Sequence, residues 1–378
     1  MLRSDWLTTG PAVERFETAF AAAAGARHAV SCANGTAALH LAALALGLGP
    51  GDIAIVPAVT FLATANAPRL AGAEIVFADV DPRTGLMTPA TLQAAWDGLD
   101  ADRRRAVRAV FPVHLNGQCC DMAAIEGWAA ERGIAVVEDA CHAVGGRYAD
   151  GGAVGSRGGM AAFSFHPVKT IACGEGGMVT TPDDALAARL RLLRSHGMVR
   201  DPAQFTETAQ ATAADGSANP WYYEMHEPGL NYRLSDIHAA LGASQLAKLE
   251  RFVRRRAALV ARYDAALAPL APVVAAMPKV PGSPAWHLYV AHIDYARAGR
   301  DRAAVMRALT ERGIGTQVHY LPLHRQPYYR RRYGDLRLDG ADAYYRSALS
   351  LPLFPAMDDA DVDRGAAALE EILCRPRP

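Results

Sequence analysis

The sequence predicts an α/β protein with a mainly parallel sheet in a large domain, followed by a smaller α+β domain. The chain has 378 residues, of which 51% are hydrophobic and 21% charged, so it can bury a large core. Short apolar runs alternate with longer helix-compatible stretches through the first two thirds, which is typical of crossover units and parallel strands. This alternation ends near residue 245. We therefore expect a large domain at 1–245, and a linking helix with a small domain at 246–378.

Seven short β-rich runs predict the strands of the large domain. They lie at 28–33, 52–57, 74–79, 108–113, 134–138, 160–165 and 177–181. The stretches between them, such as 36–47 and 121–132, are rich in alanine and leucine and therefore favour helices. The expected result is a seven-stranded sheet flanked by helices.

The last third of the chain predicts a different arrangement. Apolar residues between 236 and 268 recur mostly at helical spacing, so we expect one long linking helix there. The small domain is expected to contain two strands and two helices, at 286–293, 315–320, 301–312 and 359–373. Residues 201–220 are polar and aperiodic, which predicts a mobile excursion from the large domain.

Charge and cysteine content argue against several protein classes. Lysine plus arginine equals aspartate plus glutamate, 39 each, so no overall field attracts nucleic acid or an anionic membrane. The triplet of Arg254, Arg255 and Arg256 is expected to form a solvated helix face. The six cysteines show no CxxC spacing, so we predict neither a metal site nor disulfides, and expect a cytoplasmic protein. No apolar run has the length of a signal or a membrane span.

The turn after the first predicted strand is a candidate phosphate site. Gly35 allows close backbone approach, the Thr36 hydroxyl can donate, and Ala37 belongs to a helix N-terminus that offers free amide groups. The alternative is an ordinary strand-to-helix turn in which Thr36 caps the helix.

A second candidate lies at the end of the strand at 134–138. Asp139 would stand at the carboxyl end of a buried parallel strand, where open α/β sheets bind ligands. It could face a cationic nitrogen and stay ionised, or it could cap the segment that follows. His142 is either a structural histidine or, beside Asp139, a contact for a planar ligand.

The segment FSFHPVKTIACGEGGMVTT, residues 163–181, adds a serine and a lysine. Lys169 precedes the glycines, so the segment is not a P-loop, and a lysine alone would be read as solvated surface. Together with two phosphate donors (Thr36 and Ser164), the acid Asp139 and the aromatic Phe61, it matches the needs of pyridoxal 5′-phosphate. The lysine would form a Schiff base, the acid would hold the ring nitrogen protonated, and the aromatic would stack on the ring.

Several motifs in order resemble one family from Trp6 to about Phe354. The chain is similar to the DegT/StrS sugar-nucleotide aminotransferases, which are fold-type I enzymes dependent on pyridoxal phosphate. The motifs are DWLTTGPAVERFE, NGTAALHLAALALGLGPGD, PAVTFLATANA, VEDACHAVGGRY, FSFHPVKTIACGEGGMVTT, GLNYRLSDIHAALGASQL and VHYLPLH.

The resemblance implies a role for each matched residue of the large domain. Lys169 would bind the cofactor covalently, and Asp139 would pair with its pyridine nitrogen. The remaining cofactor contacts would be Gly35, Thr36, Ala37 and Ser164 at the phosphate, Phe61 stacked on the ring and His142 near its hydroxyl.

The resemblance also implies a homodimer with shared sites. Asn231 would reach across to the partner's phosphate site, and His319 and Tyr320 of the small domain would contact the sugar nucleotide, unless they only end a half-buried strand. The family pattern differs here at two places: Ala172 and Cys173 replace two threonines, which removes a possible hydroxyl contact with the cofactor, and Leu115 and Asn116 stand where HFAG is usual.

The features HPV before the lysine, PWYYEM and SHGMVRD look most like the subgroup of pseudaminic acid biosynthesis, which makes UDP-4-amino-4,6-dideoxy-N-acetyl-β-L-altrosamine. They imply amination of the C4 ketone of a UDP-linked 4-keto-6-deoxy-N-acetyl-hexosamine with L-glutamate. The alternatives are a perosamine precursor, a 4-keto-arabinose, or a non-catalytic regulatory descendant. A nicotinamide-dependent dehydrogenase is disfavoured because no GxGxxG follows the first strand.

Overall fold

The large domain is built on the predicted seven-stranded sheet. The computed structural model describes residues 2–3 and 5–374. All seven predicted strands are found: β1 His28–Cys32, β2 Ile53–Pro57, β3 Glu74–Ala78, β4 Val107–Val110, β5 Ala135–Asp139, β6 Met160–Ser164 and β7 Gly177–Thr181. The order is β1-β7-β6-β5-β4-β2-β3. Only β7 runs antiparallel to its two neighbours, β1 and β6, so the carboxyl ends of the other six strands meet at one edge.

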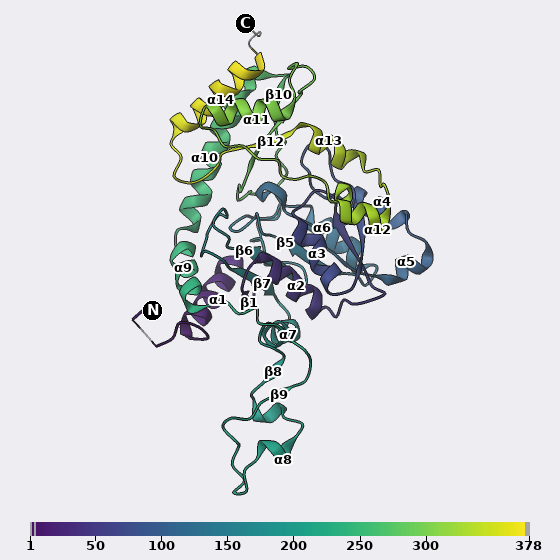
Figure 1. The fold of residues 1–378 in the computed structure, drawn as a ribbon, viewed down its shortest axis with the longest axis vertical. Coiled ribbons are helices and arrows are strands. Elements are labelled where there is room, and N and C mark those ends of the chain that lie inside the picture. Colours follow the sequence, from purple (N-terminus) through teal and green to yellow (C-terminus); the bar gives the residue numbers. More distant parts are fainter. Residues whose placement is uncertain (1, 4, 375–378) are drawn as a thin grey trace.

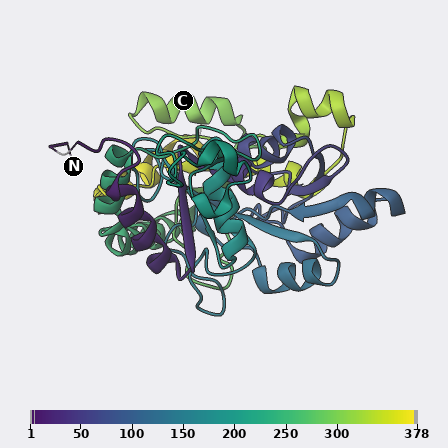
Figure 2. The same ribbon diagram turned by 90° about the horizontal axis from the view of Figure 1, so that it is seen from below.

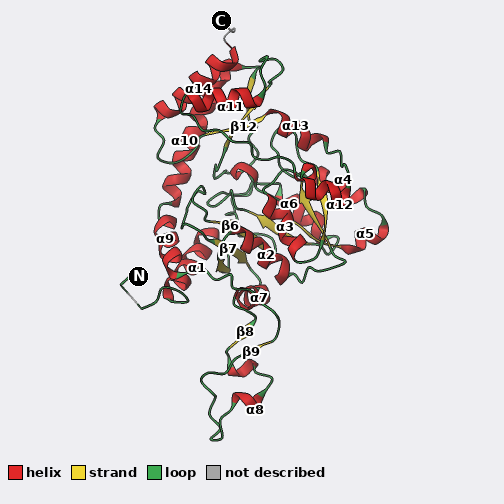
Figure 3. Cartoon of the chain, viewed as in Figure 1, coloured by secondary structure: helices red, strands yellow, loops and turns green. Residues whose placement is uncertain are grey.

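Helices surround this sheet in both ribbon views, as the alternating pattern predicts (Figures 1, 2 and 3). They are α1 Pro11–Ala24, α2 Gly35–Ala45, α3 Leu62–Leu70, α4 Pro89–Asp97, α5 Ala101–Ala106, α6 Met122–Ala130 and α7 Asp184–Arg194. Two of them show why these segments are helical. Helix α1 begins with a proline at its first turn and places Phe16 and Phe20 against Phe163 and Phe165 of the β6 segment. Helix α2 is rich in alanine and leucine and almost wholly buried.

The prediction of one long linking helix is wrong. Residues 236–268 form two helices, α9 Asp236–Leu246 and α10 Leu249–Leu267, which follow one another along one side of the molecule (Figure 1). Helix α9 packs on α1 of the large domain, whereas α10 packs on α14 (Asp359–Cys374). The break at 247–248 lets the two helices pack against different partners.

The expectation of a solvated arginine triplet is also wrong for one of its members. Arg254 is exposed and Arg255 is partly buried, but only 2% of Arg256 is accessible. Helical spacing explains this difference, since Arg256 lies on the same face of α10 as the buried Leu259, Val260 and Tyr263.

The small domain contains a three-stranded antiparallel sheet, β10 Val274–Ala276, β11 Tyr289–Ile293 and β12 Ala348–Leu351, with α11 Arg302–Glu311 and α14 against it. The strand predicted at 315–320 does not form; one bridge joins Gln317 to Ser350. The chain leaves the sheet there and turns toward the large domain, where the Tyr320 hydroxyl meets His142. The sequence analysis did not find β10 or β12.

Residues after this turn return to the large domain before β12 begins. Helices α12 Pro327–Tyr333 and α13 Asp339–Ser347 lie over its β3 edge. The Tyr333 hydroxyl donates to Glu74 of β3 and accepts from the Ile75 amide, both at 2.9 Å. The Asp79 carboxylate accepts the first amide groups of α13. The edge strand is thus covered by the chain itself.

An arm projects from the large domain between α7 and α9 (Figure 1). At its base β8 Met198–Val199 pairs with β9 Glu224–Met225, and η2 Pro202–Gln204 and α8 Thr208–Ala211 lie beyond them. The Glu224 carboxylate accepts from the amides of Thr206 and Glu207 and so closes the arm. The excursion predicted at 201–220 is therefore present, with local structure of its own. Among residues 2–3 and 5–374, no helix combines the length and the apolar character needed to cross a membrane.

Candidate active site

A cavity of about 410 Å³ lies at the sheet edge where the strands end. Its walls come from the turns after β1, β2, β5 and β6 and from the small-domain segment near 320. Nine residues singled out from the sequence line it: Gly35, Thr36, Phe61, Asp139, His142, Ser164, Lys169, His319 and Tyr320. Ala37 and Asn231 do not. The Ala37 side chain is buried inside α2, and Asn231 is exposed beside Ser195.

The turn after β1 forms a tight cradle with the end of β6. A Cβ atom on Gly35 would lie 2.7 Å from the Ser164 Cβ and 3.0 Å from its hydroxyl oxygen, so only glycine fits. The helix is capped by Asn34, whose side-chain oxygen accepts from the Ala37 amide at 2.8 Å, and not by Thr36. The exposed Thr36 hydroxyl therefore stays available to a ligand. A helix N-terminus with two hydroxyl groups beside it suits a phosphate.

Asp139 lies 5% exposed at the end of β5. One carboxylate oxygen accepts from the Thr64 hydroxyl at 2.6 Å and the other from the Cys141 amide at 3.2 Å. No helix follows, so it does not act as a helix cap. Within the described chain, no lysine, arginine or histidine nitrogen lies within 4.0 Å of this carboxylate. A buried carboxylate without a cation is costly, and a protonated ring nitrogen would compensate it.

Lys169 lies in the turn after β6, and its backbone amide donates to the His166 carbonyl at 2.8 Å. Its side chain is partly buried and has no ion pair within 4.0 Å among the described residues. Burial lowers the pKa of the amine, while the charges of Cys141 and Asp139 act in the opposite direction. A larger fraction of the amine is therefore neutral near pH 7, as a nucleophile and a base require.

His142 is held from two sides. The Asn116 amide donates to its Nδ1 at 3.3 Å, and the Tyr320 hydroxyl lies 3.1 Å from its Nε2. Burial lowers the pKa of His142 well below its usual value, with Lys169 and His319 contributing. The neutral ring therefore carries its proton on Nε2 and donates it to Tyr320. The Tyr320 proton is then free to point into the cavity.

The small domain brings two side chains to the mouth of the cavity. The Tyr320 ring lies 5.9 Å from the ring of Phe61, which is 54% exposed in the single chain. His319 contacts the Ser350 hydroxyl at 2.8 Å through Nδ1. Burial, together with the charge of Lys169, lowers the pKa of His319 to about 4. His319 is therefore neutral at physiological pH.

Sequence reasoning gave no role to several polar residues that position this site. The hydroxyl groups of Thr60 and Thr64 form a hydrogen bond of 2.7 Å behind Asp139. The two threonines lie four residues apart on either side of Phe61, and this spacing could have indicated the pair in the sequence. Asn116 adopts a left-handed backbone, with φ of 61°, in which its amide contacts His142 and its carbonyl accepts from the His287 amide. Its side chain reaches Tyr344 of α13, a contact between distant segments that no local pattern indicates.

The positions where the family pattern differs lie outside this cavity. Cys173 is fully buried and its thiol donates to the Glu175 carbonyl at 3.2 Å. Burial raises the pKa of this thiol to about 12, so it is not a nucleophile. Ala172 lines a neighbouring cavity instead.

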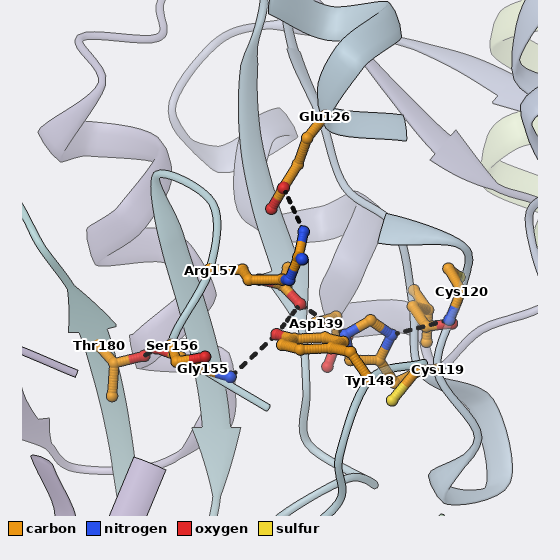
Figure 4. Close-up of polar contacts among 12 residues, drawn as sticks. Cys119, Cys120, Glu126, Asp139, Tyr148, Gly155, Ser156, Arg157 and Thr180 are labelled. Carbon is orange, nitrogen blue, oxygen red and sulfur yellow. Dashed lines mark hydrogen bonds and ion pairs between the residues drawn. The ribbon is translucent and has the colours of Figure 1, made fainter. Parts of the chain in front are cut away.

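The opposite face of β5 is fixed by a second polar network. Strand alternation points Glu138 away from Asp139, and its carboxylate accepts from Tyr148 and contacts His114 Nε2, both at 2.6 Å. The Gly155 amide donates to the Tyr148 hydroxyl at 3.0 Å, and Arg157 pairs with Glu126 nearby (Figure 4). These contacts hold the strand from which Asp139 projects.

The three parts of the cavity match the three parts of one cofactor. The Gly35 cradle suits a phosphate, the cation-free Asp139 suits a protonated pyridine nitrogen, and the Lys169 amine suits an aldehyde. With the fold-type I arrangement of sheet and small domain, they define an aminotransferase dependent on pyridoxal 5′-phosphate.

Comparison with known proteins gives the family. The model of the DegT/DnrJ/EryC1/StrS aminotransferase family matches residues 1–370, and the chain belongs to this family. It is 42% identical over 375 residues to the spore coat polysaccharide biosynthesis protein SpsC of Bacillus subtilis (strain 168), covering 98% of this chain and 92% of SpsC.

Two solved structures are similar over almost the whole chain. DesV of S. venezuelae superposes with a TM-score of 0.85 at 33% identity, covering 100% of this chain and 93% of DesV. Helicobacter pylori PseC, an aminotransferase of pseudoaminic acid biosynthesis, gives a TM-score of 0.87 at 26% identity, covering 98% of this chain and 94% of PseC.

Proposed function

We propose that this enzyme transfers the amino group of L-glutamate to the C4 ketone of a UDP-linked 4-keto-6-deoxy-N-acetyl-hexosamine. The cavity that joins Lys169, Asp139 and the Gly35 cradle supports the chemistry. The sugar substrate rests on the segments before Lys169 and at 195–201 and 220–225, and on the likeness to PseC. The match to SpsC supports a sugar destined for a polysaccharide.

When bound, pyridoxal phosphate supplies an electron sink for the carbon from which a proton is removed. The chain supplies the rest. Lys169 would hold the cofactor, and its amine, once freed, would take the proton from C2 of glutamate. In the second half-reaction the same amine works in reverse and delivers a proton to C4 of the sugar. Water supplies the keto oxygen of 2-oxoglutarate in the first half-reaction, and the ketone oxygen of the sugar leaves as water in the second.

The other residues of the cavity would orient the cofactor and the substrate. Asp139, fixed by Thr64 and the Cys141 amide, would keep the ring nitrogen protonated. Gly35, Thr36, the N-terminal end of α2 at Ala37, and Ser164 would anchor the phosphate. Phe61 would cover the ring and His142 would lie at its hydroxyl, with the Tyr320 proton directed to the reacting centre. His319 and Tyr320 would contact the sugar nucleotide.

We also propose a homodimer that completes each site. Apolar side chains stand exposed around the cavity mouth and on α9, among them Phe61, Val168 (60% exposed) and Leu241 (45%). Asn231 is exposed and outside the cavity of its own chain, as a residue that serves the partner's phosphate site would be. Sedimentation should give a dimer. Mixing Lys169→Ala protein with Asn231→Ala protein should restore part of the activity in hybrid dimers, whereas sites contained in one chain would give none.

The substrate is tested by offering the holoenzyme several keto-sugars with glutamate. The proposed UDP-sugar, a perosamine precursor and a 4-keto-arabinose are compared by kcat/KM, with mass spectrometry of the products. We expect the UDP-linked N-acetyl sugar to be preferred by about tenfold or more, the discrimination one or two missing hydrogen bonds provide. The second candidate is another nucleotide 4-keto-sugar, since the chain is 33% identical to DesI, whose structure was solved in the presence of its TDP-sugar product, and 26% identical to PseC. Preference for such a sugar would replace the first proposal.

A further inference from the structure

Two buried threonines stand behind Asp139 and form a chain of hydrogen bonds to it. The Thr64 hydroxyl lies 2.6 Å from Asp139 Oδ2, and the Thr60 hydroxyl lies 2.7 Å from that of Thr64. Thr60 is 1% exposed and Thr64 is 0% exposed, so water has no access to either hydroxyl from outside the fold. Neither threonine belongs to the cofactor contacts expected from the sequence.

Ionisation of Asp139 fixes the direction of this chain. An ionised carboxylate can only accept hydrogen bonds, so the single hydroxyl proton of Thr64 goes to Asp139. The contact between the two threonines then needs the proton of Thr60, because that of Thr64 is already used. Each bond in such a chain polarises the next, which strengthens the last one, to the carboxylate. Two hydroxyl groups thus stabilise one negative charge.

The backbone around the carboxylate also favours a negative charge. Thr64 is the third residue of α3, so Asp139 lies near the N-terminal end of that helix, where the helix dipole is positive. The other oxygen, Oδ1, accepts from the Cys141 amide at 3.2 Å. Each oxygen therefore has one protein donor and keeps a further lone pair for a ligand. A donor that carries a positive charge, such as a protonated ring nitrogen, forms the strongest hydrogen bond there.

We infer that Thr60 and Thr64 are positioning residues that keep the shared proton on the cofactor's ring nitrogen and off Asp139, which rests on the proposed pairing of Asp139 with that nitrogen. Thr64 acts through Asp139, and Thr60 acts through Thr64. Without the Thr64 hydroxyl, Oδ2 would be a buried anionic oxygen with no protein donor, which is costly. The proton would then move from the ring nitrogen toward Asp139, and the ring would accept electrons less well.

The test follows the ring nitrogen itself, in holoenzyme reconstituted with pyridoxal phosphate that carries nitrogen-15 in its ring. The NMR signal of this atom distinguishes a protonated from a neutral nitrogen. We expect a protonated nitrogen in the wild type and a shift toward the neutral position in Thr64→Val, which keeps the shape of the side chain without its hydroxyl. Thr60→Val should shift the signal in the same direction by less. Cofactor affinity should fall by about tenfold in Thr64→Val, the value of a hydrogen bond to a charged group.

Two further variants separate this role from a structural one. Thr64→Ser restores the hydroxyl and should return the signal and the affinity close to those of the wild type. Thr180→Val is the matched control, because Thr180 is 0% exposed and its hydroxyl donates to the Gly155 carbonyl at 2.9 Å, away from the cofactor cavity. It should make the protein easier to denature and leave the nitrogen signal where it is.

The outcomes separate this inference from the proposal on which it rests. An unchanged nitrogen signal in Thr64→Val would overturn the inference, and a shift in Thr64→Val with none in Thr60→Val would remove Thr60 from the chain. A neutral ring nitrogen in the wild type would instead overturn the proposed pairing with Asp139. If Thr64→Val does not fold, Thr60→Val decides the matter, because it leaves the contact between Thr64 and Asp139 in place.

Discussion

The cofactor cavity and a larger second cavity beside it, of about 1120 Å³, share Lys169 in their walls but are built in different ways. In the cofactor cavity, the polar atoms of Asp139 and His142 have directed partners within 3.3 Å. In the second cavity, Arg256, His287 and Thr316 each keep a buried polar atom without one. The polar groups of the first are therefore fixed by hydrogen bonds before a cofactor binds, whereas those of the second are only partly fixed in this way. Substitutions in the first should therefore change the chemistry.

The largest effect is expected for the residue that both cavities share. Lys169→Ala removes the amine that holds the cofactor and moves the proton, so turnover should fall by about three orders of magnitude or more. The visible absorbance of the bound cofactor should shift to that of the free aldehyde. Lys279→Ala, at an exposed ion pair with Asp264, is the control and should leave both unchanged. A Lys169→Ala enzyme that stays active and yellow would remove Lys169 from the mechanism.

The next effect compares the two faces of β5. Asp139→Asn leaves the hydrogen bonds of Thr64 possible but cannot hold a ring nitrogen protonated, so kcat should fall by about 100-fold. Glu138→Gln, one residue away on the other face, should instead lower the free energy of unfolding by about 1–3 kcal/mol and leave kcat nearly unchanged. Stopped-flow kinetics and chemical denaturation separate the two. Equal losses of kcat would show that the faces are not independent.

The two cavities also differ in how far they could be predicted from the sequence. Asp139 and Ser164 end strands β5 and β6, and Gly35 and Lys169 follow a strand within a few residues, so local pattern and the parallel sheet were enough to place them together. Family resemblance added their roles, which remain proposals. Arg256 could not be recognised, because its burial depends on carbonyl groups about 30 and 97 residues away. The break between α9 and α10 was missed for a similar reason, since it shows in the different packing partners of the two helices, which lie far away in the sequence.

A smaller effect tests the proton arrangement at His142. Tyr320→Phe removes the hydroxyl that accepts from Nε2 and donates into the cavity. We expect kcat to fall by about tenfold, because one directed hydrogen bond at the reacting centre is lost, with KM for glutamate little changed. Tyr328→Phe, at an exposed tyrosine, is the control and should leave kcat unchanged. A Tyr320→Phe variant altered only in KM would place the hydroxyl in ground-state binding.

The smallest effect is expected for His319, which lines both cavities. It tests whether this side chain is shielded from water in the folded protein. Its pKa is lowered to about 4 by burial and by Lys169, against about 6.5 in the unfolded chain. The folded state therefore resists protonation. The contribution of His319 to stability is complete above pH 6.5 and is lost as the pH falls toward 4. Between pH 7 and 5 this loss should reach about 1–2 kcal/mol. In His319→Asn, urea denaturation at the two pH values should show a smaller difference, whatever the cost of losing the Ser350 contact, because that cost is the same at both. An unchanged pH difference would mean that His319 is solvated and that its two cavities are open to water.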